Sequence, residues 1–420
     1  MQKPELLLPA GNIENLHAAL EGGADAVYLG LKQFNAREKA HNFTYSHIKS
    51  AVEMMHKHHK RVYVTLNTVI KNTELTELMD VLVNLSVIGP DALIIQDWGV
   101  LYLVQHYFEK LELHASTQMG IHNRVGTLHA RKGGIKRVIL ARELTMKEVA
   151  SIANHPGSHL ELLVHGASCY SFSGMCLFSS YLGGSGANRG LCTQPCRRLY
   201  DDGEQQEFLF NLKDNQLIHH LPEFRKMGIH SLKVEGRMRS AEYVYRVARA
   251  YRMVIDNYQH INEALQLLDM DLGREKTGYF IDGKTAASVS QTPLTGRYAG
   301  KVIRKEVDRI TIETEVSLKT GNRIRISSPD GARRETIKLR NINQTASGLD
   351  IHTPSGFPCK PGDLVYLANL REKAFSSKFD IEAHHKTIKS TVNLHDFRKP
   401  ANSPKRQGEQ LFLRDRKSVV

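Results

Sequence analysis

The sequence predicts an α/β protein whose main part is a (β/α)8, TIM-like barrel. Short apolar stretches rich in β-branched residues alternate with stretches whose apolar residues recur at helical spacing. The helical pattern is clear in TYSHIKSAVEMMHKHH, where Ile48, Val52 and Met55 fall on one face. Eight such alternations within about 250 residues are typical of this barrel. The eight predicted strands begin at Glu5, Asp25, Arg61, Asp91, Leu111, Arg137, Leu160 and His230.

The domain organisation follows from changes in this pattern. The barrel is predicted to occupy residues 1–290, with a cysteine-rich insertion at 167–200 after the seventh strand. From Gly296 onward polar and apolar residues alternate between turn signals, which predicts a small β-barrel domain over 295–370. Residues 371–420 hold 12 Lys/Arg against 6 Asp/Glu, and we expect either a basic C-terminal tail or the start of a further domain.

The composition is that of a soluble globular protein, with 41% hydrophobic and 7% aromatic residues. No apolar run approaches the roughly 18 residues that a membrane helix needs. The N-terminus also lacks a basic segment followed by an apolar one. We therefore expect a cytoplasmic protein with no membrane partner. The net charge of +13 favours a polyanion as its partner.

Four of the five cysteines lie in one segment with the spacing C-x6-C-x15-C-x3-C: Cys169, Cys176, Cys192 and Cys196. Thiols of cytoplasmic proteins stay reduced, so this clustering favours a metal or redox centre over disulfides. Four thiolates suit an iron–sulfur cluster or tetrahedral zinc, although structural zinc usually has close pairs on both sides. The pattern alone leaves iron–sulfur, zinc and unliganded thiols open. Cys359 stands apart and is expected to be structural.

Polar residues follow the predicted strands, at the rim where a barrel carries its active site. They are Asn67, Asp97, His114, Ser116, Arg142, Glu143, His165, Lys233 and Glu235. Lys233 and Glu235 are two apart on one strand, so their side chains share a face. We expect both to converge in one cavity with Arg142 and His165. The alternatives are helix caps, buried partners and a Lys233–Glu235 ion pair that braces the barrel end.

The sequence lacks the common hydrolase motifs that would support peptidase chemistry. The sequence has no H-E-x-x-H and no G-x-S-x-G. A Cys–His nucleophile pair stays open, although four clustered cysteines exceed what nucleophilic catalysis requires.

Three segments carry a specific resemblance: ELLLPAGNIENLHAALEGGADAVYLG, ELLVHGASCYSFSGMCLFSSYLGG and SLKVEGRMRSAEYV. They resemble peptidase family U32, the collagenase-like proteins, and the likeness extends over roughly residues 4–290. The resemblance implies that the four clustered cysteines hold a 4Fe-4S cluster. It also implies oxygen-independent hydroxylation of tRNA uridine, rRNA cytidine or a ubiquinone precursor. For the RNA enzymes it implies prephenate as the metabolite that donates oxygen.

Two further segments, SGANRGLCTQPCR and HASTQMGIHN, are most similar to the branch that forms 5-hydroxycytidine in 23S rRNA. We therefore expect this reaction first and 5-hydroxyuridine formation in tRNA second. Arginine and lysine at the rim suit the carboxylates of a small dianion. The predicted substrate-binding residues are Asn67, Arg142, Lys233 and Arg237. The predicted proton-transfer residues are His114, His165 and Glu235.

Two other functions stay open at this stage. One is a collagenase-like endopeptidase, as the family name says, and the other is a non-enzymatic RNA-binding assembly factor that uses the basic tail. A brown protein would support the iron–sulfur hydroxylase, whereas gelatin cleavage by a colourless protein would support the peptidase. RNA, from rRNA or tRNA, is the expected partner of the hydroxylase, and the sequence names no electron donor.

Overall fold

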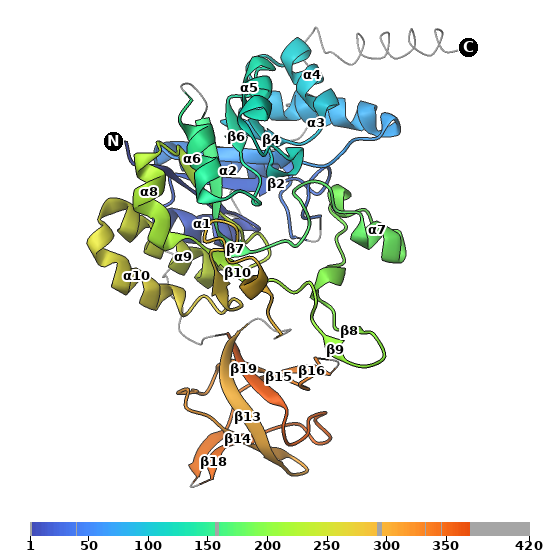
Figure 1. The fold of residues 1–420 in the computed structure, drawn as a ribbon, viewed down its shortest axis with the longest axis vertical. Coiled ribbons are helices and arrows are strands. Elements are labelled where there is room, and N and C mark those ends of the chain that lie inside the picture. The colour runs from blue at the N-terminus through green and yellow to red at the C-terminus, as the bar shows by residue number, and fades with distance from the viewer. Residues whose placement is uncertain are drawn as a thin grey trace.

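The structure, a computed structural model, describes residues 2–38, 40–155, 159–291, 296–331, 333–345 and 347–369. Its larger part is a closed barrel of parallel strands, as predicted (Figure 1). The last barrel strand, β11, pairs with β1 on one side and with β7 on the other, which closes the barrel. The eight barrel strands are β1 (Glu5–Pro9), β2 (Ala26–Gly30), β3 (Arg61–Leu66), β4 (Ala92–Ile95), β5 (Leu113–Ala115), β6 (Arg137–Ile139), β7 (His159–Ala167) and β11 (Ser231–Val234).

The strands are apolar on both sides because both sides are buried. In β1, Leu6 and Leu8 belong to the large core between strands and helices, whereas Leu7 belongs to a separate cluster in the barrel interior. Tyr28 and Tyr63 lie in the same interior cluster. The period of two thus sends alternate side chains to two different cores.

Helices pack around the barrel between successive strands. The expected helix in TYSHIKSAVEMMHKHH is α2, which buries the predicted Ile48, Val52 and Met55. The ten helices in the part of the chain that the structure describes are α1 (Ile13–Glu21), α2 (Tyr45–Lys57), α3 (Leu75–Ile88), α4 (Trp98–Tyr107), α5 (Arg124–Lys132), α6 (Met146–Ala153), α7 (Phe178–Gly183), α8 (Leu221–Lys226), α9 (Ala241–Asp256) and α10 (Ile261–Leu268). α9 begins where the Ser240 side chain accepts a hydrogen bond from the Tyr243 N–H.

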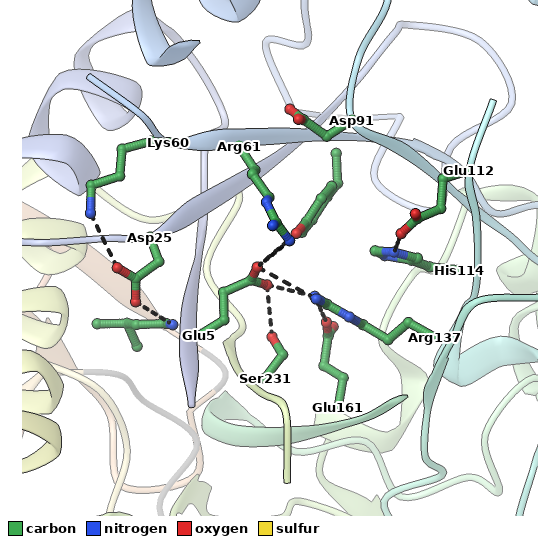
Figure 2. Close-up of polar contacts among 12 residues, drawn as sticks. Glu5, Asp25, Lys60, Arg61, Asp91, Glu112, His114, Arg137, Glu161 and Ser231 are labelled. Carbon is green, nitrogen blue, oxygen red and sulfur yellow. Dashed lines mark hydrogen bonds and ion pairs between the residues drawn. The ribbon is translucent and has the colours of Figure 1, made fainter. Parts of the chain in front are cut away.

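The N-terminal end of the barrel interior is charged rather than apolar (Figure 2). Arg137 Nη1 lies 2.5 Å from Glu5 Oε1 and 3.2 Å from Glu161 Oε2. The Tyr63 hydroxyl donates to Glu5 Oε2 at 2.8 Å, and the Ser231 hydroxyl donates to Glu5 Oε1 at 3.2 Å. Because Glu161 is fully buried and Arg137 nearly so, each glutamate depends on this arginine for compensation.

Replacing Arg137 with methionine should therefore destabilise the barrel strongly. It leaves Glu5 without its nearest cation and Glu161 with only Lys233, and removal of one partner of a buried ion pair costs about 3–5 kcal/mol. Arg61→Met is the matched control, because Arg61 lies 3.6 Å from the same Glu5 but its side chain is 61% exposed. That variant should lose at most about 1 kcal/mol. The free energy of unfolding in urea measures both, and equal losses would contradict this account.

The buried carboxylate also predicts acid sensitivity. Burial alone would raise the pKa of Glu161, but Lys233 and Arg137 outweigh it, so the pKa lies below its ordinary value. A depressed pKa contributes stability that is present above the unfolded-state value, about 4.3, and lost as the pH falls through the folded-state value. Wild-type protein should lose stability below about pH 4, and a Glu161→Gln variant should lose less over that range. If the stability of the two proteins fell in parallel as the pH was lowered, Glu161 would not be a source of the acid sensitivity.

The insertion predicted after the seventh strand is present and is followed by strands that the sequence did not predict. β10 (Asp214–Gln216) pairs antiparallel with the end of β7, and β12 (Lys276–Thr277) pairs parallel with β10. A small hairpin, β8 (Tyr200–Asp201) and β9 (Gln206–Glu207), lies between the insertion and β10. Of these additions, β10 pairs directly with the C-terminal end of β7.

The second domain is one curled antiparallel sheet in the order β16-β15-β19-β13-β14-β18-β17. Its strands are β13 (Arg297–Lys305), β14 (Arg309–Glu313), β15 (Arg323–Ser327), β16 (Arg334–Lys338), β17 (Ile342–Thr345), β18 (Gly348–His352) and β19 (Leu364–Asn369). Within the described ranges the two edge strands do not pair with each other, so the predicted small barrel is a half-barrel. Cys359 is 2% exposed in the core of this sheet.

The predicted basic tail at 371–420 lies outside the described residues. Within the described part of the chain, no helix combines the length and the apolar character needed to span a bilayer.

Candidate iron–sulfur site at the barrel mouth

The cysteine-rich insertion at 167–200, which we call the cysteine loop, leaves β7 at its C-terminal end, where the barrel opens. All four cysteines of the loop are free thiols and partly buried. Burial raises the pKa of the Cys196 thiol to about 11, Arg197 acts in the opposite direction, and the other three loop thiols, Cys169 first, add to the rise. The other thiols of the loop therefore make ionisation of Cys196 less favourable.

Cys192 already receives hydrogen bonds of the kind that support a thiolate ligand. The Gln194 backbone N–H donates to Cys192 Sγ at 3.4 Å, and the Ser179 hydroxyl lies 3.8 Å from the same sulfur. Gln194 has a φ of 54°, and this left-handed turn brings its N–H back to the sulfur. Such donors tune and orient sulfur ligands of metal centres.

Four cysteine thiolates can hold either a tetrahedral zinc ion or an iron–sulfur cluster. Tetrahedral zinc with bonds of about 2.3 Å draws its four sulfurs to about 3.8 Å from one another. No set of three or more His, Cys, Asp or Glu side chains in the described ranges is gathered for a single metal ion. An iron–sulfur cluster places several atoms between the thiolates and so needs them farther apart. The four free thiols therefore match the donor chemistry of an iron–sulfur cluster, and zinc uses the same donors.

The loop is fixed against the rim segment that follows β5. Gly174 has a φ of 77°, and a Cβ at this position would lie 1.9 Å from the Gln118 carbonyl oxygen. The Ser173 hydroxyl donates to Glu143 Oε1 at 3.0 Å, and His122 Nε2 lies 3.2 Å from Glu143 Oε2. Two rim segments, those that follow β5 and β6, therefore hold the stretch between the first two cysteines.

Gly174→Ala should release this stretch and lower the iron content of the protein. The new methyl group cannot share space with the Gln118 carbonyl, so the loop must move. Gly184→Ala is the matched control, because Gly184 has a similar φ of 68° and nothing lies within 4 Å of its added Cβ. Both variants share the backbone strain, and only Gly174→Ala has the clash. Iron per chain after anaerobic purification should fall in the first variant and not in the second. Equal iron in both would mean that docking on Gln118 does not shape the site.

Arg37 and Glu235 form an ion pair at the barrel mouth. Arg37 Nη2 lies 2.9 Å from Glu235 Oε1. Glu235 raises the pKa of Arg37, burial opposes this rise, and Cys169 adds a smaller contribution to it. Burial would raise the pKa of Glu235, but Arg37 and Lys233 outweigh it and keep it below its ordinary value. Glu235 is therefore a carboxylate at neutral pH and suited to accept a proton rather than to donate one.

Arg142 faces a cavity beside the first cysteine. The cavity is lined by Arg142, Ser168, Cys169, Asn215 and Tyr279, among other residues. The Arg142 Nε atom is buried and has no hydrogen-bond partner among the described residues. A buried guanidinium nitrogen without an acceptor is suited to receive an anionic ligand.

Two predicted substrate-binding residues, Asn67 and Arg237, are on the rim but hold protein groups. Asn67 Oδ1 accepts from the Ala36 N–H at 3.0 Å. Arg237 is 5% exposed and donates to Asn35 Oδ1 and Thr65 Oγ1, each at 3.2 Å. Both side chains shape the loop after β2 that carries Arg37.

The structure does not bring His165 and Lys233 into one cavity with Arg142. His165 Nε2 lies 2.9 Å from Asp271 Oδ2. Lys233 extends into the barrel, where its Nζ lies 3.5 Å from Glu161 Oε1 and 4.4 Å from the centre of the Tyr28 ring. The predicted convergence is therefore wrong for these two side chains. The ion pair at this position joins Lys233 to Glu161 rather than to Glu235.

His114 does not face the rim, contrary to the prediction. Its Nε2 lies 3.0 Å from Glu112 Oε1, before the start of β5, and its ring packs against Tyr63 (Figure 2). Burial lowers the pKa of His114, and burial does the same to His165. Both histidines are fully buried, so a role for either in proton transfer stays a prediction without support from their positions.

Sequence reasoning missed Arg37, His122 and Asp271. Arg37 lies in the long loop after β2, and loops at this end of a barrel commonly carry site residues. The position of Arg37 in this loop was the one feature of the sequence that could have identified it as a candidate site residue. Nothing in the sequence connects Asp271 with His165, which is 106 positions away.

Comparisons with known proteins agree on one family. The profile of peptidase family U32 matches residues 11–291. The chain is 32% identical to tRNA hydroxylation protein P1 of Bacillus subtilis, over 78% of this chain and 84% of that protein. It is 30% identical to 23S rRNA 5-hydroxycytidine C2501 synthase of Escherichia coli, over 81% of this chain and 55% of that protein. It is 29% identical to a collagenase of Porphyromonas gingivalis, over 88% of this chain and 99% of that protein.

Proposed function

Because the chain belongs to peptidase family U32, we propose that it is an RNA hydroxylase that adds a hydroxyl group to C5 of a pyrimidine. The proposed product is 5-hydroxycytidine in 23S rRNA or 5-hydroxyuridine in tRNA. The observation that carries the proposal is the group of four free thiols at the barrel mouth, beside Arg142 and the Arg37–Glu235 pair. The names of two relatives, one for tRNA and one for 23S rRNA, support the substrate class. The family and these relatives are enzymes by name, and the chain is an enzyme.

The reaction requires a cofactor. Replacing a ring hydrogen by a hydroxyl group is a two-electron oxidation, and protein side chains supply neither the electrons' acceptor nor the oxygen atom. Cys169, Cys176, Cys192 and Cys196 would hold a 4Fe-4S cluster, which supplies electron transfer when bound. We propose that the reaction does not use molecular oxygen and that prephenate is the co-substrate that provides the oxygen atom. As its C–O bond breaks, the co-substrate would also take up the two electrons that the pyrimidine ring loses.

The chain's own residues provide binding and proton transfer. Arg142, with its unpartnered Nε, would bind a carboxylate of the co-substrate next to Cys169. Glu235, ionised beside Arg37, would accept the proton that leaves the ring carbon. The target base must leave its stack to reach this mouth, because a paired base exposes no face to such a pocket.

The proposal is tested by mass spectrometry of nucleosides from total tRNA and 23S rRNA. A strain that lacks the gene should lose one hydroxylated pyrimidine, and the wild-type gene should restore it. The lost nucleoside identifies the RNA and the base. An unchanged nucleoside profile would overturn the proposal. Gelatin cleavage by colourless purified protein would favour the collagenase-like peptidase, and RNA binding without any modification would favour an assembly factor.

A further inference from the structure

A cleft lined by arginines separates the barrel from the second sheet. A cavity of about 280 Å³ lies between the beginning of α9 and strands β15 and β16. Arg239 and Arg246 line it from the barrel side, and Arg323 and Arg325 line it from β15. We call these four residues the arginine cleft. Figure 1 shows β15, β16 and β19 on the side of the sheet nearest the barrel.

The cleft brings several guanidinium groups close together. Arg246 is 8% exposed, and its Nη1 lies 3.4 Å from the Met270 sulfur, a weak acceptor. The backbone of Arg323 pairs with strand β16, but its side chain has no hydrogen bond or ion pair with any residue that the structure describes. Burial lowers the pKa of Arg325, and Arg334, Arg239 and Arg274 lower it further, so the guanidinium groups repel one another.

The acidic residues of the cleft do not cancel this charge. Asp271 lines the cavity, but its Oδ2 lies 2.5 Å from Lys276 Nζ and 2.9 Å from His165 Nε2. Glu242, in the first turn of α9, is the other acidic lining residue and forms no ion pair with a described residue. The N-terminal end of α9 adds its own partial positive charge at the same place. The four arginines of the cleft therefore outnumber the two carboxylates that line it, although Arg239 Nη2 also lies 3.9 Å from Asp214 Oδ2.

The positive surface continues toward the cysteine loop along the β15–β16 hairpin. In this hairpin Arg325 pairs with Thr336 and Ser327 pairs with Arg334. A second cavity, of about 380 Å³, is lined by Arg334 from the hairpin and by Gln194, Arg197 and Arg198 from the cysteine loop. One hairpin thus joins the arginine cleft to the loop that carries the proposed cluster.

We propose that the arginine cleft binds the phosphodiester backbone of the RNA substrate and sets the distance between that backbone and the barrel mouth. This inference rests on the proposed function. A chain of phosphates matches cations that line two successive cavities along one hairpin, whereas a small phosphorylated metabolite would fill one cavity only. Phosphate contacts of this kind fix register and orientation without reading sequence.

The test compares two double variants that remove the same charge. Arg323→Gln/Arg325→Gln changes the cleft. Arg304→Gln/Lys305→Gln changes exposed positions on β13, away from the cleft. The probe is unmodified total tRNA from the strain that lacks the gene, and binding is measured over a salt series with the full-length protein. Melting temperatures of both variants should stay close to that of the wild type, because none of the replaced side chains belongs to the apolar core of the second sheet.

The cleft variant should bind tRNA about 10-fold more weakly, and its plot of log affinity against log salt should be shallower by about 1 to 2. The control variant should stay within about 2-fold of the wild type. Equal weakening in both variants, or no weakening in the cleft variant, would overturn the inference. Nucleoside analysis of the deletion strain separates the two proposals. Cleft-dependent binding without any lost nucleoside would overturn the hydroxylase alone, and a lost nucleoside with cleft-independent binding would overturn the cleft alone.

Discussion

Cys176→Ala protein should lose most of its iron and all detectable RNA hydroxylation while its fold persists. Cys176 lies in a partly exposed loop outside the barrel core, so its removal leaves the packing of the strands unchanged. A cluster held by four thiolates loses a ligand that no neighbouring side chain replaces. Iron content after anaerobic purification and the restored nucleoside in the deletion strain are the two measurements.

The control for this variant is Cys359→Ala. Cys359 is buried in the core of the second sheet and lies outside the cysteine loop, so its variant should keep its iron even if it is somewhat less stable. Full iron content in Cys176→Ala protein would remove Cys176 from the ligand set. Equal iron loss in both variants would point to general unfolding rather than ligation.

Arg142→Gln protein should keep its cluster and lose activity by about 100-fold. The Arg142 guanidinium lines the cavity beside Cys169, and loss of one partner of a buried charged contact costs about 2–5 kcal/mol. The loss should be greatest at low concentration of the co-substrate, because the side chain acts in binding. Arg124→Gln is the control, since Arg124 is an exposed residue at the start of α5.

Two readouts separate the possible outcomes for Arg142. A cluster spectrum and a melting temperature like those of the wild type would show that the variant is intact. Normal hydroxylation by an intact variant would contradict the proposed binding role. Partial activity in Arg142→Lys would show that charge suffices, and none would show that the planar guanidinium is needed.

The barrel could be predicted because its strands carry a strong local signal. Each strand is buried on both faces, which produces a short apolar run, and each run is followed by a helix with a clear apolar face. The half-barrel was harder to predict. Whether edge strands β16 and β17 meet depends on how far the sheet curls, and alternation of polar and apolar residues does not encode this.

The cysteine cluster could be recognised because four of the five cysteines lie close together in the sequence, and their role as ligands stays a prediction. The histidines could not be placed in the same way, because a strand-end position does not say where the side chain turns. His165 faces Asp271 from a remote segment, in the part of β7 that pairs with the unpredicted β10. His114 turns back to Glu112, two residues earlier. Arg37 was missed because its importance comes from Glu235, nearly 200 positions later.

The central claim is that four cysteines at a barrel mouth hold the cluster on which RNA hydroxylation depends. Its most direct test is the iron and acid-labile sulfide content of anaerobically purified wild-type protein that has been shown to restore the lost nucleoside in the deletion strain. We expect about four iron ions and four sulfide ions per protein chain. Stoichiometric zinc with neither iron nor sulfide, in protein that still restores the nucleoside, would contradict it.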